Sequence, residues 1–329
     1  MENIKIDMTA SEIGYLWSTY QAETLNHCML TYFDKIVEDP EIKKVNKFAL
    51  DSCENNLISL KSLFSKDNIP IPVGINDSDI LTTTDRLYTD PFILYFQWFV
   101  GKGNLNYASL AINTIARDDI FDFYKNLLTK SLILLEDSRR MLLSKGLWIR
   151  APYIPVPTEV EFIKKESFLN GWFNDKRPLA GIEIASIFYN LMTNAIGQSL
   201  ISSFVQITDK GELRDYFIRG KDIAEKHIDL MSKHLKEQEI PVPNTWNTGV
   251  TSSKEPPFSE KLMLTLVTFL NAQGLSNYGN AISNSIKRDI GLDFTRLAAE
   301  VAKYGEDGTK LLIKHGWMEK PPLAKEIIG

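Results

Sequence analysis

The chain has 329 residues, of which 44% are hydrophobic and 24% are charged, and its formal net charge is −5 at pH 7. These values are typical of a folded globular protein with two domains, and they exclude a largely disordered chain. The acidic balance provides no basic face for nucleic acid, so we expect no nucleic-acid partner. The longest apolar stretches, 91–100 and 261–270, reach about half the length of a membrane span, so we also expect no membrane partner.

The first half of the chain predicts four helices. Leu16 and Tyr20 lie at helical spacing in the first of them, and Pro40 interrupts the pattern. Gly146 follows the last one, where the C-terminus of a helix favours glycine. The expected helices cover residues 9–37, 41–67, 87–116 and 119–145.

The second half repeats the first. The phrase "IPIP" at 69–72 returns as "IPVP" at 240–243, 171 positions later. The same shift places Glu12 on Glu183 and "IARDDIFDF" (115–123) on "IKRDIGLDF" (286–294). After one deletion beyond residue 123 the offset becomes 170, and "EDSRRMLLSKG" (136–146) aligns with "EDGTKLLIKHG" (306–316). We interpret this register as an internal duplication. The second set of helices is expected at residues 180–208, 211–238, 258–287 and 290–315.

A Pro-x-Pro phrase follows the second helix of each copy and begins a connection of about 18 residues. Proline cannot continue a helix, and an extended chain of that length can run along a whole helix. Two helical hairpins joined by such a crossover form the ferritin-like arrangement, with a simple up-down bundle as the alternative. The sequence therefore predicts an all-α protein of two tandem ferritin-like four-helix bundles. The expected domains are 1–147, a linker at 148–178 that packs between the bundles, and 179–329.

Three stretches carry a resemblance to a known family: "PYIPVPTEVEFIKK" (152–165), "KRPLAGIEI" (176–184) and "HGWMEKPPLAK" (315–325). Together with the duplicated bundles, they resemble the family catalogued as domain of unknown function 3231 from spore-forming Gram-positive bacteria. The resemblance implies two ferritin-like bundles in each chain, and it extends over nearly the whole sequence. Some relatives carry spore-coat-type labels, so it also implies a sporulation-related role. It implies no particular activity.

The histidines do not match a standard di-iron bundle. Such a site needs Glu-x-x-His on two helices, and no glutamate stands three residues before any of the four histidines. A different metal site is suggested by Glu23 and His27, which are i,i+4 neighbours, with Glu54 at about the same level on the next helix. Glu225 and His227 lie at that level in the second copy. The alternative to a metal site is a buried, hydrogen-bonded polar layer. We predict no catalytic residue, and no cofactor other than a possible metal ion.

Two aspartates, Asp118 and Asp289, precede the fourth helix of each copy, and we expect them to be its N-caps. No leader sequence is evident, and Cys28 and Cys53 are too few for a disulfide framework. We therefore expect a cytoplasmic protein. The family resemblance adds the forespore or the spore as an expected location.

Our leading hypothesis is a non-enzymatic protein with a structural or interaction role, through a protein partner or self-association. The alternatives are a degenerate ferritin-like metal-binding or redox protein and a small-molecule carrier.

Overall fold

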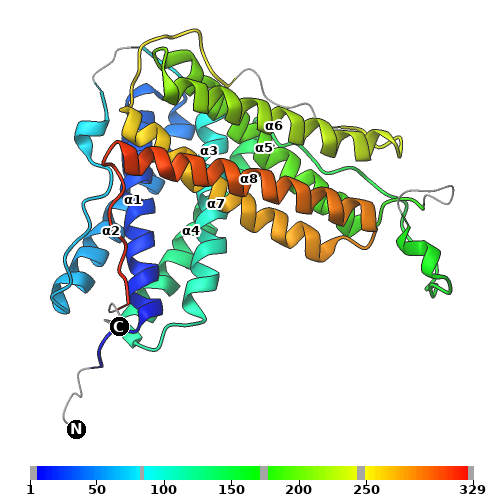
Figure 1. The fold of residues 1–329 in the computed structure, drawn as a ribbon, viewed down its shortest axis with the longest axis horizontal. Helices are drawn as coiled ribbons and strands as arrows, with labels where there is room; N and C mark the ends of the chain where they lie inside the picture. Colours follow the sequence, from blue (N-terminus) through cyan, green and yellow to red (C-terminus); the bar gives the residue numbers. More distant parts are fainter. Residues whose placement is uncertain (1–5, 82–84, 171–176, 243–248, 325–329) are drawn as a thin grey trace. The chain divides into compact units, whose positions relative to one another are not determined.

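The structure is a computed structural model that describes residues 6–81, 85–170, 177–242 and 249–324. Over these ranges the chain is all-helical, with eight α-helices, two 3-10 turns and no strand (Figure 1). No helix in the described ranges is long and apolar enough to cross a membrane. Trp172 and Phe173, which belong to the predicted linker, lie outside the described residues.

The helices follow the order predicted from the sequence. The first repeat contains α1 (Ala10–Ile36), α2 (Pro40–Lys66), α3 (Asp90–Ile112) and α4 (Asp118–Ser144), with the 3-10 turn η1 (Asp77–Asp79) between α2 and α3. The second repeat contains α5 (Gly181–Ile207), α6 (Glu212–Lys236), α7 (Glu260–Asn284) and α8 (Arg288–Lys314), preceded by the 3-10 turn η2 (Glu166–Leu169). The all-α class and the duplication are therefore confirmed.

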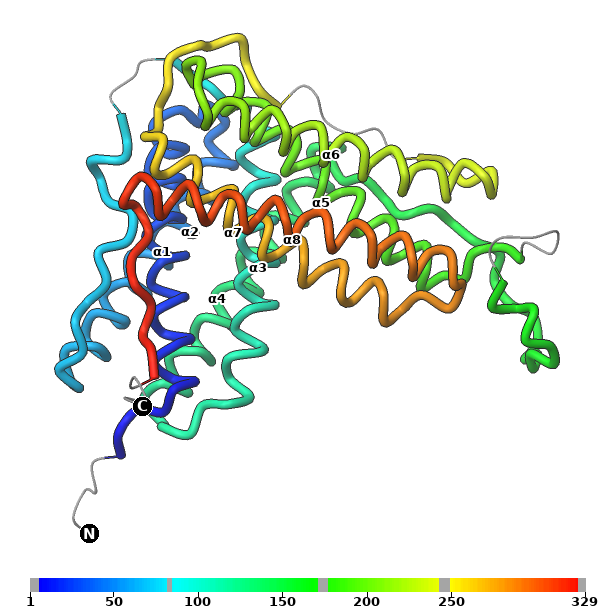
Figure 2. The backbone as a smooth tube through the Cα atoms, viewed as in Figure 1, coloured from blue at the N-terminus to red at the C-terminus, as the bar shows by residue number. Residues whose placement is uncertain are grey.

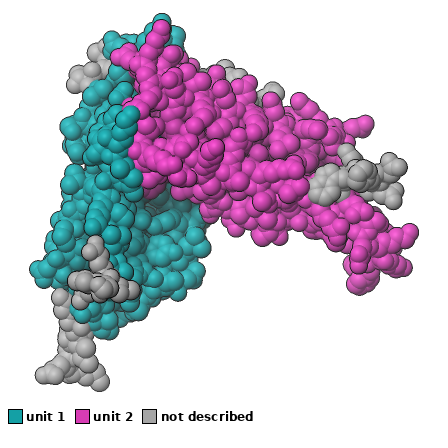
Figure 3. Space-filling model, viewed as in Figure 1, with its two compact units in different colours: residues 1–148, 251–265, 312–329 teal, residues 149–250, 266–311 magenta. Residues whose placement is uncertain are grey.

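By its internal contacts the chain divides into two compact units (Figure 3). Unit 1 comprises Met1–Trp148, Thr251–Thr265 and Leu312–Gly329, and unit 2 comprises Ile149–Val250 and Leu266–Leu311. The units do not divide at a single point of the chain. The domain ranges expected from the sequence, including the packing of the linker between two bundles, remain a prediction.

Local hydrogen bonds and backbone conformation determine where the helices begin and end. In α1 the Thr9 side chain accepts from the Glu12 backbone N–H, and the Glu12 carboxylate accepts from the Thr9 backbone N–H, which is a capping box. Gly146 and Gly316 both have positive φ, 67° and 68°, at the ends of α4 and α8. The backbone N–H groups of Gly146 and Leu147 bond to carbonyls of the last turn, which is a Schellman motif. The predicted role of Gly146 at the end of its helix is confirmed, and Gly316 has the same role at the end of α8.

The cores of the repeats correspond position by position. At an offset of 171, Leu16 of α1 matches Ile187 of α5, and both are fully buried. The third and fourth helices instead match at 170, because α3 begins at Asp90 and α7 at Glu260. Our alignment placed this one-residue deletion beyond residue 123, which is too late. It lies before α3, in the long connection, where a loop absorbs a deletion without rotating a packed helix.

The predicted N-caps of the fourth helices are also wrong. Asp118 is the first residue of α4, its N-cap is Arg117, and Arg117 makes no side-chain cap bond. In the first turn, the Ile120 N–H bonds to Asp119 Oδ1 at 3.0 Å. The N–H groups of Ala116 and Arg117, just before the helix, bond to the buried carboxylate of Glu12, at 3.0 and 2.9 Å. Glu183 accepts in the same way from the N–H groups of residues 286 and 287. Asp289 lies inside α8.

The long connections pair with each other inside unit 1, which the sequence did not predict. The connection after α2 can be followed in Figure 2 between α2 and α3. Its Leu81 N–H donates to the carbonyl of Pro257, and its Asp79 carbonyl accepts from the N–H of Ser259. An isolated antiparallel bridge joins Ile80 to Phe258. The first connection also lies next to α1, where the Thr24 hydroxyl accepts from the Ile75 backbone N–H at 3.2 Å.

Candidate functional site

A buried carboxylate marks the polar layer of the first repeat. The Glu23 side chain on α1 is only 2% exposed. Its Oε2 accepts from Asn56 Nδ2 at 3.0 Å and its Oε1 accepts from Asn104 Nδ2 at 3.3 Å. Burial raises the pKa of Glu23, and the hydrogen bonds from these amides oppose that shift. Glu23 is thus anchored by amide donors on α2 and α3.

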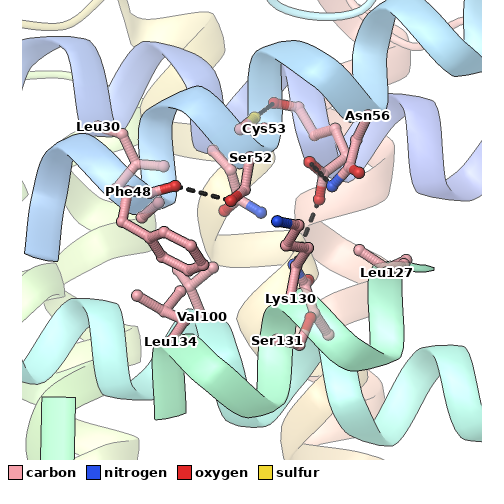
Figure 4. A pocket seen from close by; sticks show the side chains of 14 residues that line it. Leu30, Phe48, Ser52, Cys53, Asn56, Val100, Leu127, Lys130, Ser131 and Leu134 are labelled. Carbon is pink, nitrogen blue, oxygen red and sulfur yellow. Dashed lines mark hydrogen bonds between the residues drawn. The ribbon is translucent and has the colours of Figure 1, made fainter. Parts of the chain in front are cut away.

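A small cavity adjoins this carboxylate (Figure 4). Its lining includes Ser52, Asn56, Lys130 and Ser131, and its volume is about 20 Å³. That volume suits about one water molecule, whereas pockets for organic ligands usually measure about 300 Å³ or more. The centre of the first repeat therefore gives no support to the carrier hypothesis.

The polar layer of the second repeat is built around His227. Its ring is fully buried, with Nδ1 2.8 Å from Tyr278 Oη and Nε2 3.0 Å from Glu300 Oε2. Asn194 Nδ2 lies 2.9 Å from the same tyrosine oxygen. Since the carboxylate only accepts, Nε2 donates to Glu300. In the neutral ring Nδ1 then accepts from the Tyr278 hydroxyl, in place of the bond that this hydroxyl can donate to Asn194 Oδ1 at 3.1 Å. Burial lowers the pKa of His227, and Glu300 opposes the shift.

The two layers occupy equivalent places but differ in chemistry. At the offset of 171, Glu23 corresponds to Asn194, and Asn56 corresponds to His227. At the offset of 170, Lys130 corresponds to Glu300. The acid therefore sits on the first helix of one repeat and on the fourth helix of the other. In each layer, polar side chains form hydrogen bonds with side chains on neighbouring helices.

The five metal candidates do not converge on one site. Glu23 bonds to Asn56, while His27 is partly exposed, with Nε2 3.7 Å from Glu54 Oε1. Glu225 is exposed on α6, and His227 belongs to the network around Tyr278. The predicted pairing of His27 with Glu54 is present as a contact, and Glu23 is bonded elsewhere.

Two residues near His27 were not predicted as ligands. Asp77, in η1, has its Oδ1 3.9 Å from His27 Nδ1, and the buried Cys28 donates to the carbonyl of Asn76 at 3.4 Å. Burial raises the pKa of the Cys28 thiol to about 12, with Asp77 and Asp79 adding to the shift and Lys261 opposing it. The sequence signal was the Asn76-x-x-Asp79 capping pattern, which fixes a turn at this point of the long connection.

The comparisons with known proteins give one family. The model described as "Protein of unknown function (DUF3231)" matches residues 1–160 and again residues 167–326. No curated protein matches the chain. A crystal structure described as a "putative spore coat protein" from Bacillus halodurans C-125 is similar at a TM-score of 0.42 and 21% identity. That similarity covers 46% of this chain and 98% of the other.

Proposed function

The chain belongs to the DUF3231 family of proteins of unknown function, and we propose that it is a non-enzymatic structural protein that self-associates. The observation that carries this proposal is the apolar surface of residues 150–165, which we call the apolar segment. Its exposed large side chains are Tyr153 (85%), Val156 (86%), Val160 (87%) and Phe162 (82%). Ile163 is also exposed. Several large apolar side chains exposed within one short segment are typical of a protein-binding site.

The backbone of the apolar segment suits a docking role. Residues 150–165 form neither helix nor strand, and Pro152, Pro155 and Pro157 restrict their conformation. A restricted chain loses less entropy when a partner covers it. Burying one Val, Ile or Phe side chain is worth about 1.5–3 kcal/mol, so the four such side chains at 156, 160, 162 and 163 can together hold a stable contact.

The charges at the end of the apolar segment favour a second copy of the same chain as the partner. Glu159 and Glu161 are followed by Lys164 and Lys165. In an antiparallel pairing of two copies that places Glu161 of each opposite Lys164 of the other, the interface contains two such ion pairs. Such a self-complementary surface is what a two-fold symmetric interface requires. A spore setting for this assembly rests on the family resemblance alone.

The test is sedimentation analysis of the wild type and of charge variants. We expect the wild type to form dimers or larger assemblies, and Glu161→Lys or Lys164→Glu alone to weaken them by placing like charges opposite each other. The double exchange, Glu161→Lys with Lys164→Glu, should restore association. Ile58→Ser and Leu132→Ser, which alter exposed apolar residues in unit 1, are the matched controls. A wild type that remains monomeric, or a double exchange that fails to restore association, would refute the proposal.

A further inference from the structure

Three potential metal ligands of different chemistry meet beside α1. One ligand atom each from His27, Cys28 and Asp77 lies within 4.8 Å of the other two. His27 and Cys28 are consecutive residues of α1, and Asp77 comes from η1 in the long connection. The long connection thus contributes a third potential ligand to the two that α1 provides.

The turn that carries Asp77 is fixed on both sides. On one side, the Thr24 hydroxyl of α1 accepts from the Ile75 backbone N–H at 3.2 Å. On the other, Asp79 Oδ2 accepts from the backbone N–H of Asn76 at 3.0 Å, which closes the capping box of η1. The Cys28 thiol also donates to the carbonyl of Asn76. Asp77 is 86% exposed at its side chain, so it can turn toward an ion without breaking a packed contact.

Glu54 supplies the support that a metal-binding histidine usually has. It lies on α2 near Nε2 of His27, whereas Asp77 lies near Nδ1 of the same ring. The Nε2–Oε1 distance of 3.7 Å is longer than a hydrogen bond, so Glu54 must move closer to accept from Nε2–H and so leave the Nδ1 lone pair free to bind a metal. Carboxylate partners of this kind fix the tautomer and orientation of ligating histidines.

We propose that His27 Nδ1, Cys28 Sγ and Asp77 bind one Zn²⁺ ion, with Glu54 orienting His27. A thiolate and an imidazole favour zinc over magnesium or calcium, which prefer oxygen ligands. Three protein ligands leave a fourth tetrahedral position for water. Lys261, which bonds to the carbonyl of Gly74, places one positive charge near the thiol and partly offsets the acidic groups.

The duplication restricts this site to the first repeat. At the offset of 171, His27 corresponds to Gln198 and Cys28 corresponds to Ser199. Gln and Ser are poor zinc ligands, so the expected stoichiometry is one ion per chain. This site is independent of the apolar segment, and its test does not depend on self-association.

The test uses Co²⁺ as a spectroscopic substitute for Zn²⁺ on the full, reduced chain. We expect one Co²⁺ per chain, with a sulfur-to-cobalt charge-transfer band and the visible bands of tetrahedral cobalt, both abolished by added Zn²⁺. Cys28→Ser should remove the charge-transfer band. Cys53→Ser is the matched control, because the Cys53 thiol bonds to the carbonyl of Glu23 and should leave the band intact.

Two further variants separate ligation from folding. Asp77→Asn changes an exposed side chain, so it should weaken Co²⁺ binding while the far-ultraviolet circular dichroism stays unchanged. Glu54→Gln should keep the charge-transfer band but lower Co²⁺ affinity about 10- to 100-fold, as loss of a supporting carboxylate does. A wild type without the band, or a band that persists in Cys28→Ser, would overturn the proposal.

Discussion

Removing the Glu12 carboxylate should destabilise the first repeat markedly. Glu12 is fully buried and accepts from three backbone N–H groups, those of Thr9, Ala116 and Arg117, at 2.7, 3.0 and 2.9 Å. Arg117 is buried, so in Glu12→Ala its backbone N–H would be left without a hydrogen-bond acceptor. Such an unsatisfied buried donor lowers the free energy of unfolding by about 1–3 kcal/mol. Thr9 and Ala116 are exposed, and water replaces their lost partner in part. We expect a total loss of about 3 kcal/mol from the free energy of unfolding.

The assay is urea unfolding followed by circular dichroism, with Glu12→Gln as the matched variant. Gln keeps an oxygen acceptor but loses the charge, so its loss should be about 1 kcal/mol. Burial alone would raise the pKa of Glu12, but the backbone hydrogen bonds outweigh it and hold that pKa below 4.5. The charge therefore stabilises the fold above pH 4.5, and this contribution is lost as the pH falls through the lower folded pKa. Glu12→Gln should lack that acid-side loss. Unfolding free energies within about 0.5 kcal/mol of each other for wild type and Glu12→Ala would refute this reasoning.

Two other predictions concern unit 2. A Cβ on Gly220 would overlap the buried hydroxyl of Tyr304, so Gly220→Ala should lower the free energy of unfolding by about 1–3 kcal/mol. Gly197→Ala has free space around it in the same unit and should raise that energy by about 0.5–1 kcal/mol; equal thermal melts for both variants would contradict the packing argument. The lowered pKa of His227 means that the unfolded chain takes up its proton first, so stability should fall as the pH drops below about 6.5. His227→Asn, which installs the residue found at Asn56, should flatten that dependence in urea titrations between pH 7 and pH 5, and an unchanged slope would contradict it.

Features governed by local sequence were predictable. Gly146 ends its helix as predicted, and Gly316 has the same conformation at the end of α8, because a C-terminal Schellman motif needs only a few neighbouring residues. The match of Glu12 with Glu183 was visible in the sequence and corresponds to the same bonds in both repeats. The interpretation of Asp118 as an N-cap failed because Asp118 is already the first helical residue, and Asp119 Oδ1 accepts from the Ile120 N–H in the first turn. Glu12, from a distant helix, accepts from the N–H groups of Ala116 and Arg117, which precede that turn.

The candidate site depended on contacts that the sequence does not encode locally. Helical spacing placed Glu23 and His27 on neighbouring turns of one helix. It could not show that Asn56 and Asn104, from two other helices, donate hydrogen bonds to Glu23. The approach of Asp77 to His27 depends on the path of the long connection. That path is held by the bridge between Ile80 and Phe258, which are far apart in the chain. No spacing rule predicts such a contact.

Hydrogen–deuterium exchange at low and high protein concentration tests the central claim, self-association through the apolar segment, most directly. Pro152, Pro155 and Pro157 carry no N–H, so the signal comes from the other residues of 150–165. We predict that these amides exchange more slowly at high concentration in the wild type. The slowing should disappear in Glu161→Lys and return in the double exchange with Lys164→Glu. Equal exchange of residues 150–165 at both concentrations, or slowing confined to other surfaces, would contradict the account.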